Sequence, residues 1–338
     1  MGLFSRRKKP AEPPRKQDTY PFTFTALAAV DPFLALEARS PASATDPPAP
    51  DMPPLPFALP EPPPAVEVVP GMPDNVLLVA ALQQLEHEPT PADMLGILRQ
   101  SLQGNLFVRM KGDHLMQRMA GEPYELAYID DGKHLFSTAY SSAAAVRDAL
   151  LAWGSDPADN YVAQMPVRDV YQYVSAGPFA GLVLDDSSTP IPVTIPTGYI
   201  DEALDDSDLS FALKSLIAAP RDEHSEARVA DALPSSWLWV AVRDENGSGD
   251  FVLADVAMPD GNHYLLLFSH PFEVLSVPWE MRQDHFTIAK PMQFSFEQAR
   301  EVLQQNPQMT GVLVDPAGPM IAIRREVLDA VAARKAAW

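Results

Sequence analysis

An internal repeat is the feature of this 338-residue sequence that most limits what it can fold into. The segment 180–185 (Ala-Gly-Leu-Val-Leu-Asp) corresponds to 310–315 (Thr-Gly-Val-Leu-Val-Asp), 130 positions later. The turn Asp131–His134 corresponds to Asp260–His263 at an offset of 129, and a third match lies at an offset of 131. Because separate elements keep nearly one spacing, the pattern predicts a duplicated domain.

The hydrophobic periodicity predicts the same order of helices and strands in both copies, and therefore an α+β fold. Thr90, Ser142 and Ser295 are expected to cap helices, the last in a capping box with Gln298. The predicted organisation is a disordered arm over 1–73, one small domain over 74–200 and a more divergent copy over 207–330. An acidic junction at 201–208 is expected to be a solvated linker between the copies.

The predicted arm is rich in proline and begins with a basic patch. Residues 1–73 hold about half of the 36 prolines, which remove backbone donors and disfavour helix in the preceding residue. Such a stretch buries too little apolar surface to offset the entropy lost on ordering. The basic patch at Arg6–Lys9 is either a solvated charged end or a contact for an acidic partner or a lipid.

Composition excludes several classes of function. The net charge of −20 repels nucleic-acid phosphates and anionic membranes, so neither nucleic-acid binding nor a stable membrane anchor is expected. No run reaches the roughly 18–20 apolar residues of a spanning helix. The absence of cysteine excludes disulfides, thiol catalysis and thiolate metal sites, and fits a reducing, cytoplasmic compartment. The sequence leaves the oligomeric state open.

No known catalytic motif is present, so no catalytic residue, cofactor or metal is predicted. His134 and His263 follow the two Asp-Gly turns, and Asp185 and Asp315 each end a predicted strand. These four positions are candidate ligand-binding residues or structural residues. A histidine there can bond the turn backbone, and an Asp after a strand commonly forms a local turn.

The pattern resembles a bacterial family. Leu126–Ile129, Asp131-Gly132, Leu135–Thr138 and Ser142 are similar to the N-terminal domain of the SseB family, whose closing step is Gly, three apolar residues, Asn and Pro. Here that step is Gly181–Asp186 and, closer to the family form, Gly311–Pro316, with Asp in place of Asn in both. The resemblance covers roughly 75–197 and, more weakly, 208–325. It implies two SseB-like copies with no transferable catalytic residues; the family is linked by name to serine sensitivity and to type III secretion.

We therefore expect a non-catalytic, cytoplasmic protein-interaction or regulatory protein that binds a protein partner. Two alternatives remain open at this stage. One is a secretion-associated chaperone or effector, and the other is an enzyme with an unrecognised site near His134 and His263.

Overall fold

The computed structural model describes residues 61–85, 89–111, 126–153, 160–187, 192–206, 211–244, 251–258, 261–277 and 290–336. Residues 1–60 of the predicted arm lie outside this part. Residues 61–73 are described, and they are tied to the domain that follows. The backbone N–H of Asp74 donates to the Val66 carbonyl at 2.7 Å, and the Gln164 side chain donates to the Pro73 carbonyl.

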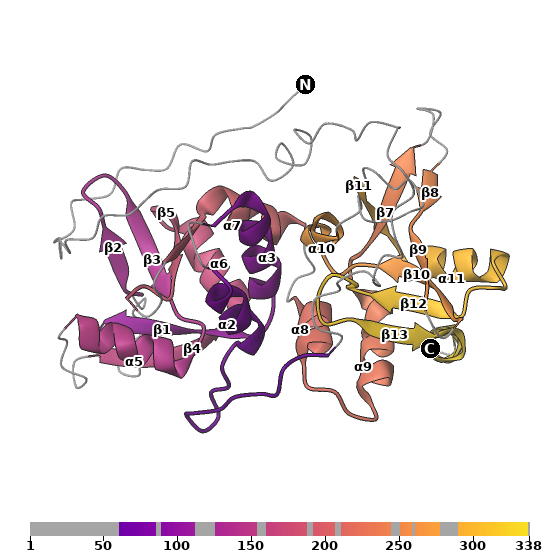
Figure 1. Ribbon diagram of the computed structural model, residues 1–338, viewed down its shortest axis with the longest axis horizontal. Coiled ribbons are helices and arrows are strands. Elements are labelled where there is room, and N and C mark those ends of the chain that lie inside the picture. The colour runs from indigo at the N-terminus through magenta and orange to yellow at the C-terminus, as the bar shows by residue number, and fades with distance from the viewer. Residues whose placement is uncertain are drawn as a thin grey trace, which may run out of the picture.

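The first half contains a four-stranded sheet in the order β2-β3-β5-β6 and a two-stranded ribbon, β1-β4 (Figure 1). Its strands are β1 (Asn105–Lys111), β2 (Tyr128–Asp130), β3 (Leu135–Ala139), β4 (Asn160–Pro166), β5 (Phe179–Leu184) and β6 (Val193–Pro196). Its helices are α2 (Val76–Gln83), α3 (Pro91–Ser101), α5 (Ala143–Ala152), α6 (Val167–Ala176) and α7 (Thr197–Asp205).

The second half contains a four-stranded sheet in the order β9-β10-β12-β13 and a three-stranded sheet, β11-β7-β8. Its strands are β7 (Leu238–Asp244), β8 (Phe251–Leu253), β9 (Asp255–Ala257), β10 (His263–Leu267), β11 (Lys290–Phe294), β12 (Gly311–Val314) and β13 (Ile321–Arg324). Its helices are α8 (Ala212–Ala218), α9 (Ser225–Ala232), the 3₁₀ turn η2 (Leu233–Ser235), α10 (Pro271–Ser276), α11 (Phe296–Gln305) and α12 (Arg325–Ala336).

The two four-stranded sheets have the same pairing scheme. In each sheet the first pair is antiparallel, the central pair (β3-β5 or β10-β12) is parallel, and the last pair is antiparallel. In each half an antiparallel pair, β1-β4 or β7-β11, is joined to the sheet by a bridge, Phe107 to Tyr140 or Trp239 to Phe268. The predicted α+β class is confirmed, and the shared order is the one that a duplicated domain would have.

Local capping explains where several helices begin. The Thr90 hydroxyl accepts from the backbone N–H of Asp93, whose carboxylate accepts from Thr90 in return. Ser295 and Gln298 form the same reciprocal arrangement, and Ser142 caps α5. These contacts satisfy backbone donors that have no partner inside the helix, and they confirm the predicted caps.

The predicted acidic linker is wrong for most of its length, because α7 continues to Asp205. Ile200 and Ala203 lie three positions apart and are fully buried, whereas Asp201 and Asp205 face outward. The acidic residues therefore form the exposed side of an amphipathic helix. Residues 207–210 lie outside the described part.

One hydrophobic core crosses the boundary between the halves. The core of the first half includes Phe211, which precedes α8, and Phe272 and Leu275 from α10. Helix α3 faces α10 across this boundary (Figure 1). Burial of apolar surface therefore fixes the two halves against each other.

Candidate functional site

His134 lies at an exposed turn before β3. Both its backbone N–H and that of Lys133 donate to the Asp131 carboxylate, at 2.7 and 2.8 Å. These two hydrogen bonds hold the pKa of Asp131 below its ordinary value. The imidazole Nδ1 is 3.6 Å from the same carboxylate, and 59% of the side chain is exposed. The turn thus uses the backbone N–H of His134 and the carboxylate of Asp131, whereas the sequence interpretation had the His134 ring bonding the turn backbone.

His263 is the first residue of β10, and its Nε2 lies 2.5 Å from the Asp255 carboxylate on β9. Its backbone N–H and carbonyl both bond Thr310 at the start of the parallel neighbour, at 3.2 and 2.6 Å. Asp255 lies eight residues before His263 in the sequence and meets its ring because β9 and β10 pair in the folded sheet. The His263 imidazole and the Asp255 carboxylate therefore form a partly exposed contact.

The structure does not place the two histidines at equivalent positions. Phe136 pairs with the repeat glycine of β5, and Tyr264 pairs with that of β12. His134 therefore lies two residues before Phe136, which pairs with the glycine of β5, whereas His263 lies one residue before Tyr264, which pairs with the glycine of β12. Successive residues of a strand point to opposite faces, so this one-residue shift separates the two side chains.

Asp185 and Asp315, by contrast, repeat in detail. Both have positive φ, 51° and 53°, at the end of the second parallel strand. The backbone N–H of Ser141 donates to Asp185 at 2.6 Å, and that of Ser269 donates to Asp315 at 2.7 Å. Each serine hydroxyl also bonds its Asp. Instead of a purely local turn, each Asp connects the carboxyl ends of the two parallel strands.

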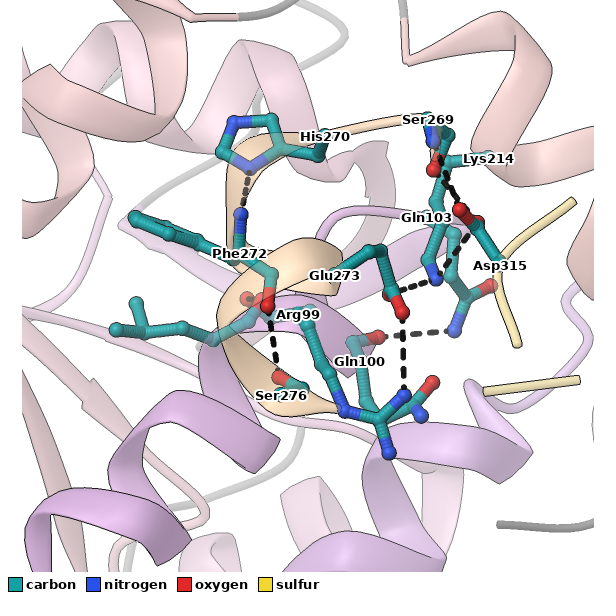
Figure 2. A network of polar contacts seen from close by, with 12 residues as sticks. Arg99, Gln100, Gln103, Lys214, Ser269, His270, Phe272, Glu273, Ser276 and Asp315 are labelled. Carbon is teal, nitrogen blue, oxygen red and sulfur yellow. Dashed lines mark hydrogen bonds and ion pairs between the residues drawn. The ribbon is translucent and has the colours of Figure 1, made fainter. Parts of the chain in front are cut away.

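Asp315 also joins a buried network of charges, shown in Figure 2. Lys214 of α8 contacts the Glu273 carboxylate and lies 3.2 Å from Asp315. Arg99 of α3 reaches Glu273 from the first half at 3.4 Å. Glu273 and Asp315 are fully buried, and Lys214 is 3% exposed. Two cations and two carboxylates therefore meet beside the boundary between the halves.

The charges of the network compensate one another. Burial raises the pKa of Asp315, with Lys214 opposing and Glu273 adding to that rise. Burial alone would also raise the pKa of Glu273, but Lys214 and Arg99 outweigh it and hold that pKa below its ordinary value. Each carboxylate is paired with a cation, which is the arrangement that makes buried charge tolerable.

His270 lies next to the network at the start of α10, and its ring is neutral. Its Nδ1 accepts from the Phe272 backbone N–H at 3.1 Å, and its Nε2 is 3.3 Å from the Ala203 carbonyl of α7. Burial lowers its pKa to about 3, and Lys214 lowers it further against the opposing effects of Ala203 and Glu273. His270 therefore caps α10 and bonds the first half.

Sequence reasoning missed Arg99, Lys214, His270 and Glu273. The one signal for Lys214 was a lysine in the middle of an apolar helix, at a position where burial predicts a partner. Arg99 and Glu273 are 174 residues apart, so no local pattern joins them. Within the described residues, no group of three or more His, Asp or Glu side chains could hold a metal ion.

Comparison with known families shows that residues 211–330 match the SseB protein N-terminal domain. The match covers the second half, although the sequence resemblance is stronger over 75–197, and one copy is matched rather than two. No curated protein and no solved structure matches the chain. In the part of the chain with described structure, no helix has the length and apolar character needed to cross a bilayer.

Proposed function

We propose that this chain is a non-catalytic protein-interaction or regulatory protein made of two SseB-like halves. The observation that carries the proposal is the buried network of Arg99, Lys214, Glu273 and Asp315, together with the core that crosses the boundary. The most deeply buried charged side chains pair with one another, so their role is to stabilise the fold. The match to the SseB domain supports the family assignment of the second half, and the shared strand order supports its extension to the first.

The outer surface of both halves supports a role in binding proteins. Exposed apolar side chains include Leu151 at the end of α5, Tyr161 on β4 and Trp237 before β7. Tyrosine and tryptophan are frequent anchors of protein interfaces. The charge of −20 favours a protein partner over nucleic acid or an anionic membrane. The lack of cysteine fits our proposal of a cytoplasmic location.

A second candidate function, catalysis near His263, rests on its 2.5 Å contact with Asp255. A His-Asp pair is the arrangement that orients a catalytic imidazole. The His134 side chain has a different environment, so a catalytic role here would belong to the second half alone.

The double variant His134→Ala/His263→Ala separates the two candidates. We expect the double variant to cross-link the same partners from lysate as the wild-type protein, with unchanged binding affinity. Its free energy of unfolding should fall by about 1–2 kcal/mol, because hydrogen bonds and His–Asp contacts are lost. Trp237→Ser and Leu151→Ser, which alter the exposed surface, should each be tested for loss of those partners. A folded double variant that retains its partners but loses its cellular role would contradict the proposal and favour the enzyme.

A further inference from the structure

The last strand of each four-stranded sheet is an edge strand. Strand β6 ends the order β2-β3-β5-β6, and β13 ends the order β9-β10-β12-β13. Within the described residues, no further strand pairs with either of them. An edge strand presents backbone N–H and C=O groups that can pair with a strand of another chain. What covers these groups therefore determines whether a second copy can extend the sheet.

The shared strand pairing identifies one outward position on each edge. The repeat glycine of β5 pairs with Pro196, and the repeat glycine of β12 pairs with Arg324. The next residue, Arg325, donates its backbone N–H to the Thr310 carbonyl at 2.9 Å, on the side of β12. Successive N–H groups of a strand point in opposite directions, so the N–H of Arg324 points away from β12. Pro196 occupies the same outward position on β6.

Glu226 of helix α9 binds the outward N–H of Arg324. Its Oε1 accepts from that N–H at 2.9 Å and from the Arg324 Nε at 3.2 Å, and its Oε2 accepts from Nη2 at 3.0 Å. Burial alone would raise the pKa of Glu226, but the hydrogen bonds and charge of Arg324 outweigh it and hold that pKa below its ordinary value. One ionised carboxylate therefore both satisfies the edge donor and covers it.

The fold fixes Glu226 at this edge. Glu226 lies in the first turn of α9, and Val229, about one turn later, is 1% exposed in the second core. The Asp222 carboxylate accepts from the His224 backbone N–H at 2.9 Å and from the Arg228 side chain at 3.0 Å, which holds the start of the helix. Helix α9 and β13 lie side by side (Figure 1). Glu226 therefore reaches the edge from a packed helix.

The first half closes the same position with a different residue. Proline has no backbone N–H, so Pro196 leaves no donor at the outward position of β6. Proline and charged side chains on edge strands are two of the means by which natural proteins prevent pairing with another chain. Both halves form the same sheet, so neither residue is needed for pairing with the inner neighbour. Pro196 and the Glu226–Arg324 pair have in common that the outer donor is removed or occupied.

We propose that Pro196 and Glu226 prevent the outer edges of the two sheets from pairing with a second copy of this chain. A strand that pairs antiparallel with its own copy forms a two-fold contact, in which each strand both donates and accepts. Residue 324 would be a donor in such a pair of β13 strands. With Glu226 bound, that donor is occupied, and the carboxylate lies where the second strand would approach. On β6 the donor is missing.

Two double variants of the full chain test the proposal: Glu226→Ala/Arg324→Val and Glu226→Ala/Arg324→Pro. Both lose the ion pair, and they differ in whether position 324 has a backbone N–H. In sedimentation velocity over a range of concentrations, we expect the valine variant to reach about twice the mass of the wild-type protein. The proline variant should sediment like the wild type. The same sedimentation for both double variants, whether associated or not, would overturn the proposal.

Pro196→Val makes the same test in the first half and does not depend on the folding of a proline variant. It supplies the missing N–H to β6, so it should also form a dimer. Thr194→Val is the matched control, because it adds the same side chain to β6 and leaves the backbone donors unchanged. It should sediment like the wild type. If Pro196→Val did not associate, or if both variants associated equally, the backbone donor would not control pairing of the edge, and the proposal would be wrong.

Discussion

At the scale of single residues, Asp185 and Asp315 make the same contact with a serine backbone, and Asp315 also takes part in a network of buried charges. Both aspartates bond the serine after the neighbouring parallel strand. Asp315 also meets Lys214 of α8, at 3.2 Å. Burial raises the pKa of Asp185 to about 6, with its bonds to Ser141 opposing that rise.

Lys214→Met should be among the most destabilising substitutions in the chain. It removes the cation between Glu273 and Asp315, which are both fully buried. Breaking one partner of a buried network leaves uncompensated charge, so we expect a loss of about 3–5 kcal/mol in urea unfolding. The matched control is Lys335→Met, whose ion pair with Glu297 is more than half exposed; it should cost at most about 1 kcal/mol. Similar losses in the two variants would contradict a structural role for the network.

At the scale of elements, the repeat glycines have a shared geometric reason. A Cβ placed on Gly181 would lie 2.5 Å from the Ile195 carbonyl oxygen of β6, and one on Gly311 would collide with the Ile323 carbonyl oxygen of β13. In both cases the obstacle is backbone of the antiparallel neighbour, which cannot move without disturbing the sheet. The glycine on which the predicted duplication partly rests is therefore needed for close strand approach.

Gly181→Ala and Gly311→Ala should each destabilise the protein by about 1–3 kcal/mol, as overpacking does. Thermal unfolding measured by circular dichroism would show the change. Gly96→Ala is the control, because nothing lies within 4 Å of its added Cβ and the position is inside α3. That substitution should stabilise the helix by about 0.5–1 kcal/mol. If neither Gly181→Ala nor Gly311→Ala lowered the unfolding temperature, β5 and β6, and likewise β12 and β13, could move apart without loss of stability.

Periodicity and capping residues predicted most helices and strands of the repeat, because those signals are local. The strands β4 and β11 were missed, since each contains a proline and polar residues that weaken the strand pattern. Helix α7 was taken for a linker because its acidic residues are closely spaced, although Ile200 and Ala203 mark its buried side. Asp185 and Asp315 were found from the repeat itself. The charge network depends on contacts between the halves, which a local pattern cannot show.

At the scale of the whole molecule, the two halves share one core and one ion network. Phe272 and Leu275 belong to α10 of the second half but pack in the core of the first, and Arg99 of the first half pairs with Glu273 of the second. Separating the halves would expose these apolar side chains and leave a buried carboxylate with one cation fewer. The chain should therefore behave as one cooperative unit rather than as two independent domains.

Phe272→Ala should break that cooperativity. In wild-type protein, we expect pulse-labelling hydrogen exchange to give the same urea midpoint for α6 in the first half and α11 in the second. Truncating Phe272, which is fully buried, removes about 3–5 kcal/mol of packing at the boundary, so the midpoints should separate. Phe296→Ala makes the same truncation inside the second core, where Phe296 is 3% exposed. Phe296→Ala should lower the urea midpoints of α6 and α11 together, because the boundary is intact and the whole chain loses stability as one unit. Separate midpoints in the wild-type protein would show that the halves unfold independently and that the boundary contributes little to stability.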